Sequence, residues 1–398
     1  MRAVLAGRGA RHAWIVAVAF AAVHADPILA DPPSAPRATS PEPRSAAAGT
    51  FDAVVKKAEA AKEAGRYDEA IQYYRQALKL KPSWREGRFL LGTLLYDNDH
   101  PEEARDEFRR LVQADPQNGM VLALKGLCEF QLKNYERALK ELQAARALGI
   151  PSPELMSLAS YHIAILLNRF EQYESAFEVL RDFALLNKDI QTVIEAFGLS
   201  ILRMPLLPSE APADRRELIL MAGRAGFHQA KGRATPTGRM AFEELVSRYP
   251  NAPNVHYAYG VFLVRDQPEA GLEEFRRELR SSPSHHHAML QIAYELMKEG
   301  KYEEARPYAE KAVDLAPNLF VAHHALGRIQ FQTGDVDKAI DSLETARRLA
   351  PDSPEVRFSL ARAYAKAGRA EEAARERAEF VKLDKARSKP EVVPPAKN

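Results

Sequence analysis

The sequence has very little cysteine, since Cys128 is the only one in 398 residues. A lone thiol excludes an intramolecular disulfide, whatever the redox state of the compartment. Apolar residues make up 46% of the chain and charged residues 28%, so most of it can fold in water around an apolar core. A single cysteine in such a chain is typical of a small core residue, and we expect Cys128 to be buried rather than reactive.

The short motifs that carry common enzyme chemistry are also missing. There is no GxxxxGK[ST] phosphate loop, no GxSxG nucleophile turn, no HExxH and no CxxC. Acidic pairs at 303–304 and 371–372 stand where helices are expected to begin, and carboxylates there favour the positive end of the helix dipole. We therefore predict that the chain is not an enzyme, has no catalytic residues and needs no cofactor.

An excess of positive charge is lacking as well. The formal net charge is +2, and the first 25 residues contribute Arg2, Arg8 and Arg11 without any acid. Without that segment, 53 basic residues face 54 acidic ones. Proteins that bind nucleic acid gather Lys and Arg on one face. We therefore expect no nucleic-acid partner.

Histidine is the only metal-ligand type that clusters, at 285–287. Consecutive side chains on a helix point about 100° apart, so all three cannot face one ion. We predict no metal site, although His256, His323 and His324 leave a weak transition-metal site open.

The first residues resemble a targeting segment. Positive residues precede an apolar run at 13–23, which is shorter than the roughly 20 residues of a membrane-spanning helix. Val23-His24-Ala25 fits a cleavage site, and a second cut after Ala30 is possible. We predict a signal peptide at 1–25, a disordered Pro/Ala-rich linker at 26–48 and a disordered tail at 388–398. The mature chain would be periplasmic or secreted, without a stable membrane span.

Prolines recur at a fixed interval. Pro82 and Pro116 are 34 residues apart, and a later series is spaced by 33, 34 and 34 residues: Pro250, Pro283, Pro317 and Pro351. Each follows a stretch of helical periodicity, which a proline ends because it lacks a donor and its ring clashes with the preceding turn. The period predicts a repeated supersecondary unit.

Small and large residues recur in phase with these prolines. Counting from the start of each unit, the eighth and twentieth positions are small, and the twenty-fourth is large and apolar, as in Gly92, Ala104 and Phe108. A glycine near position fifteen allows a tight turn between two helices. Small residues let the paired helices approach, and each pair needs the next one to bury its apolar face.

Three segments carry a family resemblance: GRYDEAIQYYRQALKLKP (65–82), GKYEEARPYAEKAVDLAP (300–317) and GDVDKAIDSLETARRLAP (334–351). Over residues 51–387 the chain resembles the tetratricopeptide-repeat family. With the targeting segment, it looks like an exported bacterial member. The resemblance implies an all-α fold, a right-handed α-solenoid of helix–turn–helix repeats.

A proline-rich insert at 204–213 interrupts the repeats. Pro205, Pro208 and Pro212 exclude regular helix there. The helix before the insert has no obvious second helix, and the phase restarts after it. We interpret the insert as a break between an N-terminal sub-array, 51–203, and a C-terminal sub-array, 214–387. It is either a tolerated surface loop, or a hinge or an added contact surface.

The resemblance also implies where a partner binds, because first-helix side chains line the concave face in this family. Aromatic and Arg side chains carry much of the binding energy in protein interfaces. Carried over position by position, the predicted groove comprises Phe89, Tyr96, Phe130, Tyr161, Tyr257, Tyr294, His324, Arg328, Phe331, Phe358 and Arg362. We expect about half of them to be exposed. The lysine–asparagine clamp of some relatives is not matched, since Tyr, Phe, Val and Leu occupy the comparable positions.

We therefore predict a non-catalytic scaffold that binds segments of other proteins in the groove, in a role such as cell-envelope assembly. Two alternatives stay open: an exported module that binds glycan or metal, and a recruiting subunit for a separate enzyme. The highly charged last helix at 371–387 is typical of a solenoid cap, which favours a monomer.

Overall fold

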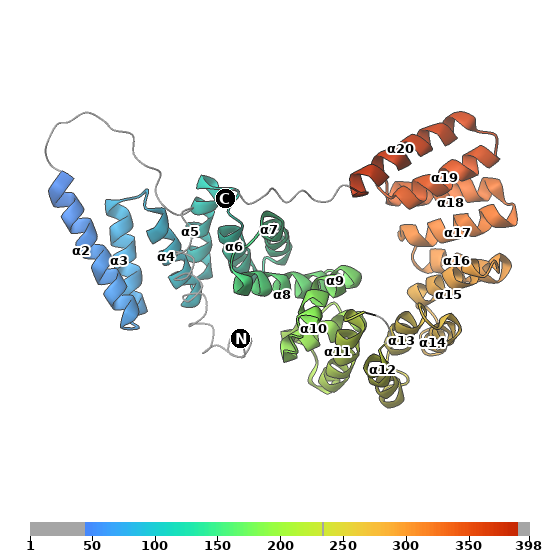
Figure 1. Cartoon of the computed structure of the whole chain (residues 1–398), viewed down its shortest axis with the longest axis horizontal. Helices are drawn as coiled ribbons and strands as arrows, with labels where there is room; N and C mark the ends of the chain where they lie inside the picture. Colours follow the sequence, from blue (N-terminus) through green and yellow to red (C-terminus); the bar gives the residue numbers. More distant parts are fainter. Residues whose placement is uncertain (1–43, 233–234, 389–398) are drawn as a thin grey trace. The chain divides into compact units, whose positions relative to one another are not determined.

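The computed structural model describes the backbone of residues 44–232 and 235–388, and within these ranges the chain is helical with no strand (Figure 1). The predicted signal peptide, residues 26–43 of the predicted linker and residues 389–398 of the predicted tail lie outside the described residues. The linker prediction is wrong at its end, because the first described helix begins at Arg44. Three consecutive alanines at 46–48 are strong helix formers and extend that helix towards the N-terminus.

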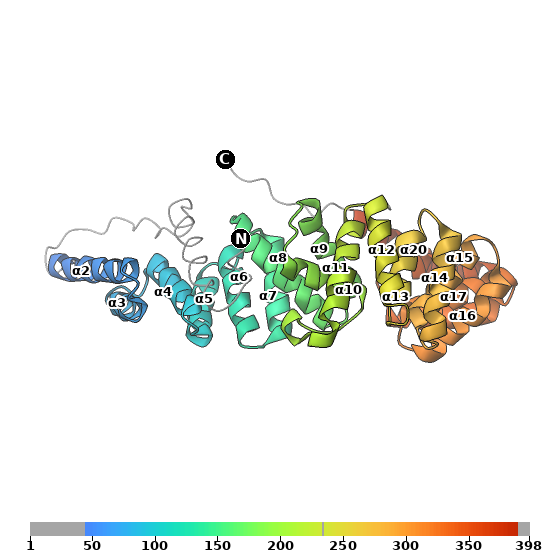
Figure 2. The ribbon, with the colours of Figure 1, turned by 90° about the horizontal axis from the view of Figure 1, so that it is seen from below.

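The helices form two compact units that divide after Gly232. In unit 1 the helices pack in sequential antiparallel pairs, α2 with α3 through α10 with α11 (Figures 1 and 2). Their bounds are α2 Arg44–Glu63, α3 Tyr67–Leu80, α4 Arg85–Asp97, α5 Pro101–Ala114, α6 Gly119–Gln131, α7 Tyr135–Leu148, α8 Pro153–Arg169, α9 Tyr173–Leu185, α10 Gln191–Ile201 and α11 Arg216–Ala230, with two short 3₁₀ turns, η3 Pro208–Glu210 and η4 Ala213–Arg215.

Unit 2 begins with a single helix and continues with pairs, α13 with α14 through α19 with α20 (Figure 2). Its helices are α12 Pro236–Arg248, α13 Val255–Leu263, α14 Pro268–Ser281, α15 His286–Lys298, α16 Tyr302–Leu315, α17 Phe320–Thr333, α18 Val336–Leu349, α19 Pro354–Lys366 and α20 Ala370–Ser388. The predicted solenoid of stacked helix pairs is therefore confirmed.

The predicted packing rule holds inside the pairs. A Cβ added to Gly92 would lie 2.8 Å from the Phe108 ring, and one added to Gly327 would lie 2.7 Å from Leu343. The small eighth residue thus makes room for the large twenty-fourth residue of its own repeat. The closing prolines also lie where expected, two residues after a second helix, as Pro82 follows Leu80 and Pro351 follows Leu349.

The insert differs from its predicted role. It connects α10 to α11, and these two helices pack against each other as the fifth pair of unit 1. The loop itself is docked, because Leu207 is buried with Phe197 and Phe227, and the Pro205 carbonyl accepts a hydrogen bond of 2.8 Å from Arg169. The predicted boundary at 204–213 therefore falls inside a helix pair, whereas the compact units divide after Gly232.

The turn inside most of the described repeats contains a left-handed residue. Glycine fills this position in several repeats, including Gly65 at φ 71° and Gly300 at φ 76°. Three repeats of unit 1 instead place Asp99, Lys133 and Glu171 there, at φ 60–61°. A side chain in this region of backbone space costs roughly 1–2 kcal/mol, because Cβ crowds the following carbonyl.

Lys133→Gly should therefore raise the free energy of unfolding of unit 1 by about 1 kcal/mol. Urea denaturation followed by circular dichroism measures the change. Lys133→Ala is the matched control, because it removes the same charge but keeps Cβ. Equal stability of the two variants would rule out relief of backbone strain as the cause.

Candidate functional site

The histidines act as structural groups. The His285 ring caps α15, accepting a hydrogen bond at Nδ1 from the Ala288 amide at 3.0 Å, while its Nε2 lies 2.8 Å from Asn254 Oδ1. His256 lies 2.6 Å from a Glu274 carboxylate oxygen and 2.9 Å from the Pro250 carbonyl. Across the described residues, no group of three His, Cys, Asp or Glu side chains is arranged to hold a metal ion.

Cys128 is fully buried in the core of unit 1, as the sequence predicts. Burial raises the pKa of its thiol, and the neighbouring Glu129 carboxylate raises it further. The reactive thiolate is therefore strongly disfavoured at neutral pH.

Four of the predicted groove residues belong to the core. Phe89, Tyr161, Tyr257 and His324 are each at most 8% exposed. They share the fifth position of the repeat, where the second helix of the same repeat and the following repeat cover the side chain. Phe89 packs against Phe108, and Tyr257 against Phe275 and His285. The prediction that these four line an open groove is wrong for this physical reason.

Two further predicted residues in unit 1, Tyr96 and Phe130, are half-buried against the same core. The Phe130 ring contacts Tyr135 and lies edge-on to His162, with centroids 4.6 Å apart. These rings stabilise the stack and offer only part of their surface to a partner.

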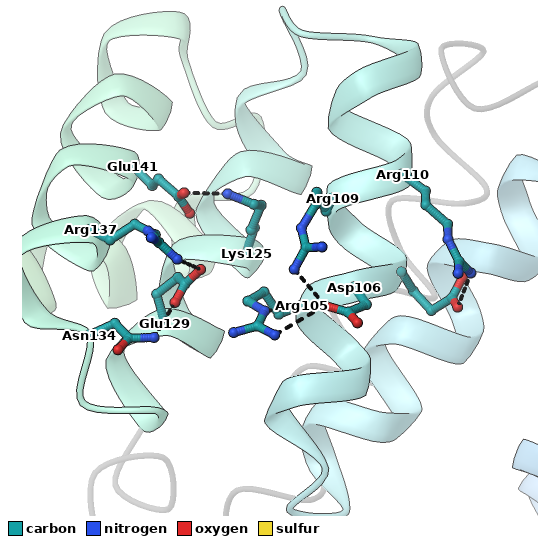
Figure 3. Close-up of polar contacts among 10 residues, drawn as sticks. Arg105, Asp106, Arg109, Arg110, Lys125, Glu129, Asn134, Arg137 and Glu141 are labelled. Atoms are coloured by element: carbon teal, nitrogen blue, oxygen red, sulfur yellow. Dashed lines mark hydrogen bonds and ion pairs between the residues drawn. The ribbon is translucent and has the colours of Figure 1, made fainter.

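Basic side chains in the middle of unit 1 are paired with acids. Asn134 and Arg137 both point at the buried Glu129 carboxylate, at 2.7 and 3.4 Å (Figure 3). In the same view Lys125 pairs with Glu141, and the guanidinium groups of Arg105 and Arg109 meet Asp106. These contacts lie within α5 and between α6 and α7, and they engage the basic groups that would otherwise be available to a ligand.

One cavity of about 570 Å³ opens at the turn between α6 and α7. Its lining includes Lys133, Arg137, Arg169 and Phe170. Arg137 is engaged with Glu129, and Arg169 donates to the Pro205 carbonyl. With two of its basic groups used inside the unit, we assign no ligand to this cavity.

In unit 2 the remaining predicted residues come together. The first helices α15, α17 and α19 contact one another in sequence, so they form one layer of the unit. We call their shared patch the aromatic–cationic surface, and it consists of Tyr294, Arg328, Phe331, Phe358, Arg362 and Lys366. Within it, the Arg362 guanidinium lies 5.0 Å from the Phe331 ring centre and 5.9 Å from that of Phe358.

Phe358 differs from every aromatic at the same repeat position. It is 47% exposed, whereas Phe89 is 1% exposed. Among the described helices α19 is the last first helix, and the Phe358 ring lies 5.4 Å from the Phe380 ring of α20 while remaining about half exposed. An exposed large ring beside cations is a typical anchor for a partner.

Arg328 shapes the electrostatics of this surface. Burial and, secondly, the Arg328 charge lower the pKa of the neighbouring His324 to about 4, so that imidazole is neutral at physiological pH. Burial also raises the pKa of Tyr294, which the Arg328 charge partly opposes. The lasting positive charge therefore resides on Arg328, Arg362 and Lys366.

The sequence prediction omitted Lys366, which belongs to the surface. Its ammonium lies 4.8 Å from the Phe331 ring centre and donates to the Phe331 carbonyl at 3.3 Å. A helical spacing of four residues from Arg362 was the available signal, because such residues share one helix face.

Pairs of helices with small residues at their contacts, and an exposed patch on the first helices, define an α-helical repeat protein of the kind that binds other proteins. Tetratricopeptide-repeat family models match residues 46–83, 55–119, 89–153, 262–319, 296–355 and 334–376. Together they cover more than half of the chain, which therefore belongs to the tetratricopeptide-repeat family. This fold is typical of non-catalytic scaffolds.

Relatives share this architecture over part of their length. The chain is 25% identical over 339 residues to cellulose synthase operon protein C of Xanthomonas axonopodis pv. citri (strain 306), covering 81% of this chain and 21% of the relative. It is 28% identical over 125 residues to the human protein O-mannosyl-transferase TMTC1, covering 31% and 14% respectively. The chain thus spans about a fifth or less of these relatives.

Among solved structures, MamA from Desulfovibrio magneticus RS-1 is similar at 20% identity and a TM-score of 0.40, over 44% of this chain and 98% of MamA. Within the part of the chain that the structure describes, no helix is both long and apolar enough to span a membrane.

Proposed function

We propose that the chain is a scaffold whose unit 2 holds a polypeptide segment of another protein on the aromatic–cationic surface. The observation that carries the proposal is the half-exposed Phe358 ring, set beside Phe331 and the Arg362 guanidinium. Buried rings at the same repeat position in unit 1 cannot act in this way, because neighbouring repeats cover them.

Rigid helices support such a site. Phe331 and Arg328 lie one helical turn apart on α17, and Phe358 and Arg362 one turn apart on α19. Side chains spaced by three or four residues share a helix face, so each helix offers one ring and one cation to the same side. A partner segment that crosses both helices would meet two such ring–cation pairs.

A pair of crosslinking positions tests the proposal. A photo-crosslinking amino acid at Phe358 should capture a defined partner in the source cells, whereas the same group at Leu349 should not. Leu349 is a matched control because it is also exposed, at 38%, but lies on the second helix α18.

The captured partner is then measured against variants. Arg328→Ala with Phe358→Ala should weaken its affinity at least tenfold, because aromatic and Arg anchors each contribute about 2 kcal/mol in well-packed interfaces. Leu349→Ala should leave it unchanged. Unaltered affinity in the double variant, or equal capture from both positions, would contradict the proposed surface. Glycan recovered at Phe358 instead would favour the alternative of a glycan-binding module.

A further inference from the structure

The aromatic–cationic surface carries positive charge that no acid neutralises. Within residues 50–232 and 235–387, no carboxylate forms an ion pair with Arg328, Arg362 or Lys366. The closest acids along these helices are engaged elsewhere: Glu295 pairs with Lys298 at 2.6 Å, and Glu355 with Arg387 at 2.5 Å. This differs from unit 1, where basic groups such as Lys125 and Arg137 face carboxylates.

Aromatic rings hold two of these cations, Arg362 and Lys366, in place. Phe331 has the Arg362 guanidinium at 5.0 Å and the Lys366 ammonium at 4.8 Å from its ring centre. An exposed cation–π contact contributes only about 0.5–1 kcal/mol, and the Lys366 ammonium uses one of its three donors on the Phe331 carbonyl. A guanidinium presents five donors in a planar fork that matches a carboxylate. The surface is thus arranged to accept carboxylates beside apolar side chains.

Resting on the proposed function, we infer that the bound segment is acidic and extended, with carboxylates at every third residue and a large apolar side chain between them. The axes of packed helices lie about 8–10 Å apart, and the proposed spacing of the acids matches this interval between α17 and α19. An extended polyproline II segment advances about 3.1 Å per residue with three residues per turn, so side chains three residues apart lie on the same face about 9 Å apart. The apolar residue between two acids would contact Phe331 and Phe358.

Charge complementarity favours an acidic peptide over a nucleic acid. Nucleic-acid grooves follow the backbone with a stripe of cations, whereas this surface holds three cations around two rings. Among the described helices, α19 is the last first helix, and the patch ends on it.

Fluorescence anisotropy with the full chain tests the inference. The probe is a fluorescein-labelled nine-residue peptide with Asp at every third position and Phe between them. Matched probes replace each Asp by Asn, replace each Asp by Lys, or gather the same Asp residues at one end. A labelled single-stranded DNA of similar length is the fourth comparison.

The acidic probe should bind at least tenfold tighter than the Asn probe and several-fold tighter than the probe with gathered acids. Its affinity should fall about tenfold between 50 and 300 mM salt, because exposed ion pairs are screened. Arg328→Glu with Arg362→Glu should remove binding of the acidic probe and improve binding of the Lys probe. Leu349→Ala, on α18, should change none of these values.

Each negative result of these binding measurements would contradict a different part of the inference. Equal binding of the Asp and Asn probes, both weakened by Phe358→Ala, would overturn the acidic preference and leave the polypeptide site standing. Tighter binding of DNA than of the acidic peptide would overturn the choice of partner. No binding of any probe up to millimolar concentration would overturn the inference and count against the site. Dimerisation that Phe358→Ala abolishes would show instead that a second copy covers the surface.

Discussion

Gly198→Ala is expected to destabilise unit 1 by about 3 kcal/mol, although alanine is the better helix former by roughly 1 kcal/mol. A Cβ at Gly198 would lie 1.9 Å from the Ile219 carbonyl oxygen, and one at Gly223 would lie 2.0 Å from the Ile194 carbonyl oxygen. Each glycine thus faces the backbone of the partner helix, so no side-chain rotation can relieve the clash. α10 and α11 would have to separate.

The two glycines act on one contact, which gives a sharper test. A single separation of α10 and α11 makes room for both methyl groups, so the double variant Gly198→Ala with Gly223→Ala should cost clearly less than the sum of the single variants. Arg224→Ala is the matched control, because Arg224 is exposed beside Gly223 on the same helix. It should change stability by no more than about 0.5 kcal/mol.

The loss should be local as well as large. Repeat stacks are held together mainly by contacts between neighbouring pairs, so one weakened pair can open while the others stay folded. Native-state hydrogen exchange should therefore show faster exchange in α10 and α11 than in α4 and α5. Unchanged denaturation midpoints and exchange rates in both single variants would refute the close approach of these helices.

The α10–α11 pair also shows why repeats could not be counted correctly from the sequence in this region. Elsewhere a short turn follows each first helix, as between Asp97 and Pro101. Here the connection runs from Leu202 to Arg215, which is longer than the turn in other repeats. The pattern of the second helix is therefore out of phase with the 34-residue period, and repeat counting places this helix in the next sub-array. Gly198 was expected at its repeat position, but the role of Gly223 depends on a partner that only the folded chain identifies.

Prediction of the candidate site from the sequence was limited in a similar way. Repeat position identified Arg328, Phe331, Phe358 and Arg362 as one face. The structure brings Phe331, Phe358 and Arg362 together, and Arg328 lies one turn from Phe331 on α17. Repeat position alone could not separate Phe358 from Phe89, because both occupy the fifth position of a first helix. Exposure depends on whether another repeat follows, and this is a property of the array rather than of the local sequence.

Asp97 is the second position where a large effect is expected, because its carboxyl group is buried without a partner. The residue is 5% exposed, and neither carboxylate oxygen has a hydrogen-bond partner among the described residues. Burial raises the pKa of Asp97 from 3.8 to about 8. Its place as the last residue of α4, at the negative end of the helix dipole, also disfavours the ionised form.

The raised pKa fixes the direction of the pH dependence. In the unfolded chain Asp97 loses its proton near pH 3.8, whereas in the folded chain it keeps the proton until about pH 8. The folded state therefore binds more protons between these values, and its stability falls as pH rises. The stabilisation that comes from keeping the Asp97 carboxyl protonated is fully present below about pH 3.8 and is lost by about pH 8. The expected slope is about 1.4 kcal/mol per pH unit.

Asp97→Asn should remove this slope, because the amide has nearly the same shape and does not titrate. Between pH 4 and pH 8 the variant should gain on the order of 4 kcal/mol over the natural chain in free energy of unfolding. Urea denaturation followed by Trp84 fluorescence measures this, since that ring lies at the start of α4. Other titrating groups are common to both proteins and cancel in the difference.

Asp52→Asn, at an exposed position on α2, is the matched control, and its profile of stability against pH should be parallel to that of the natural chain. A parallel profile for Asp97→Asn itself would mean that the Asp97 carboxyl is ionised in the folded protein, and so has a partner or water that offsets its burial.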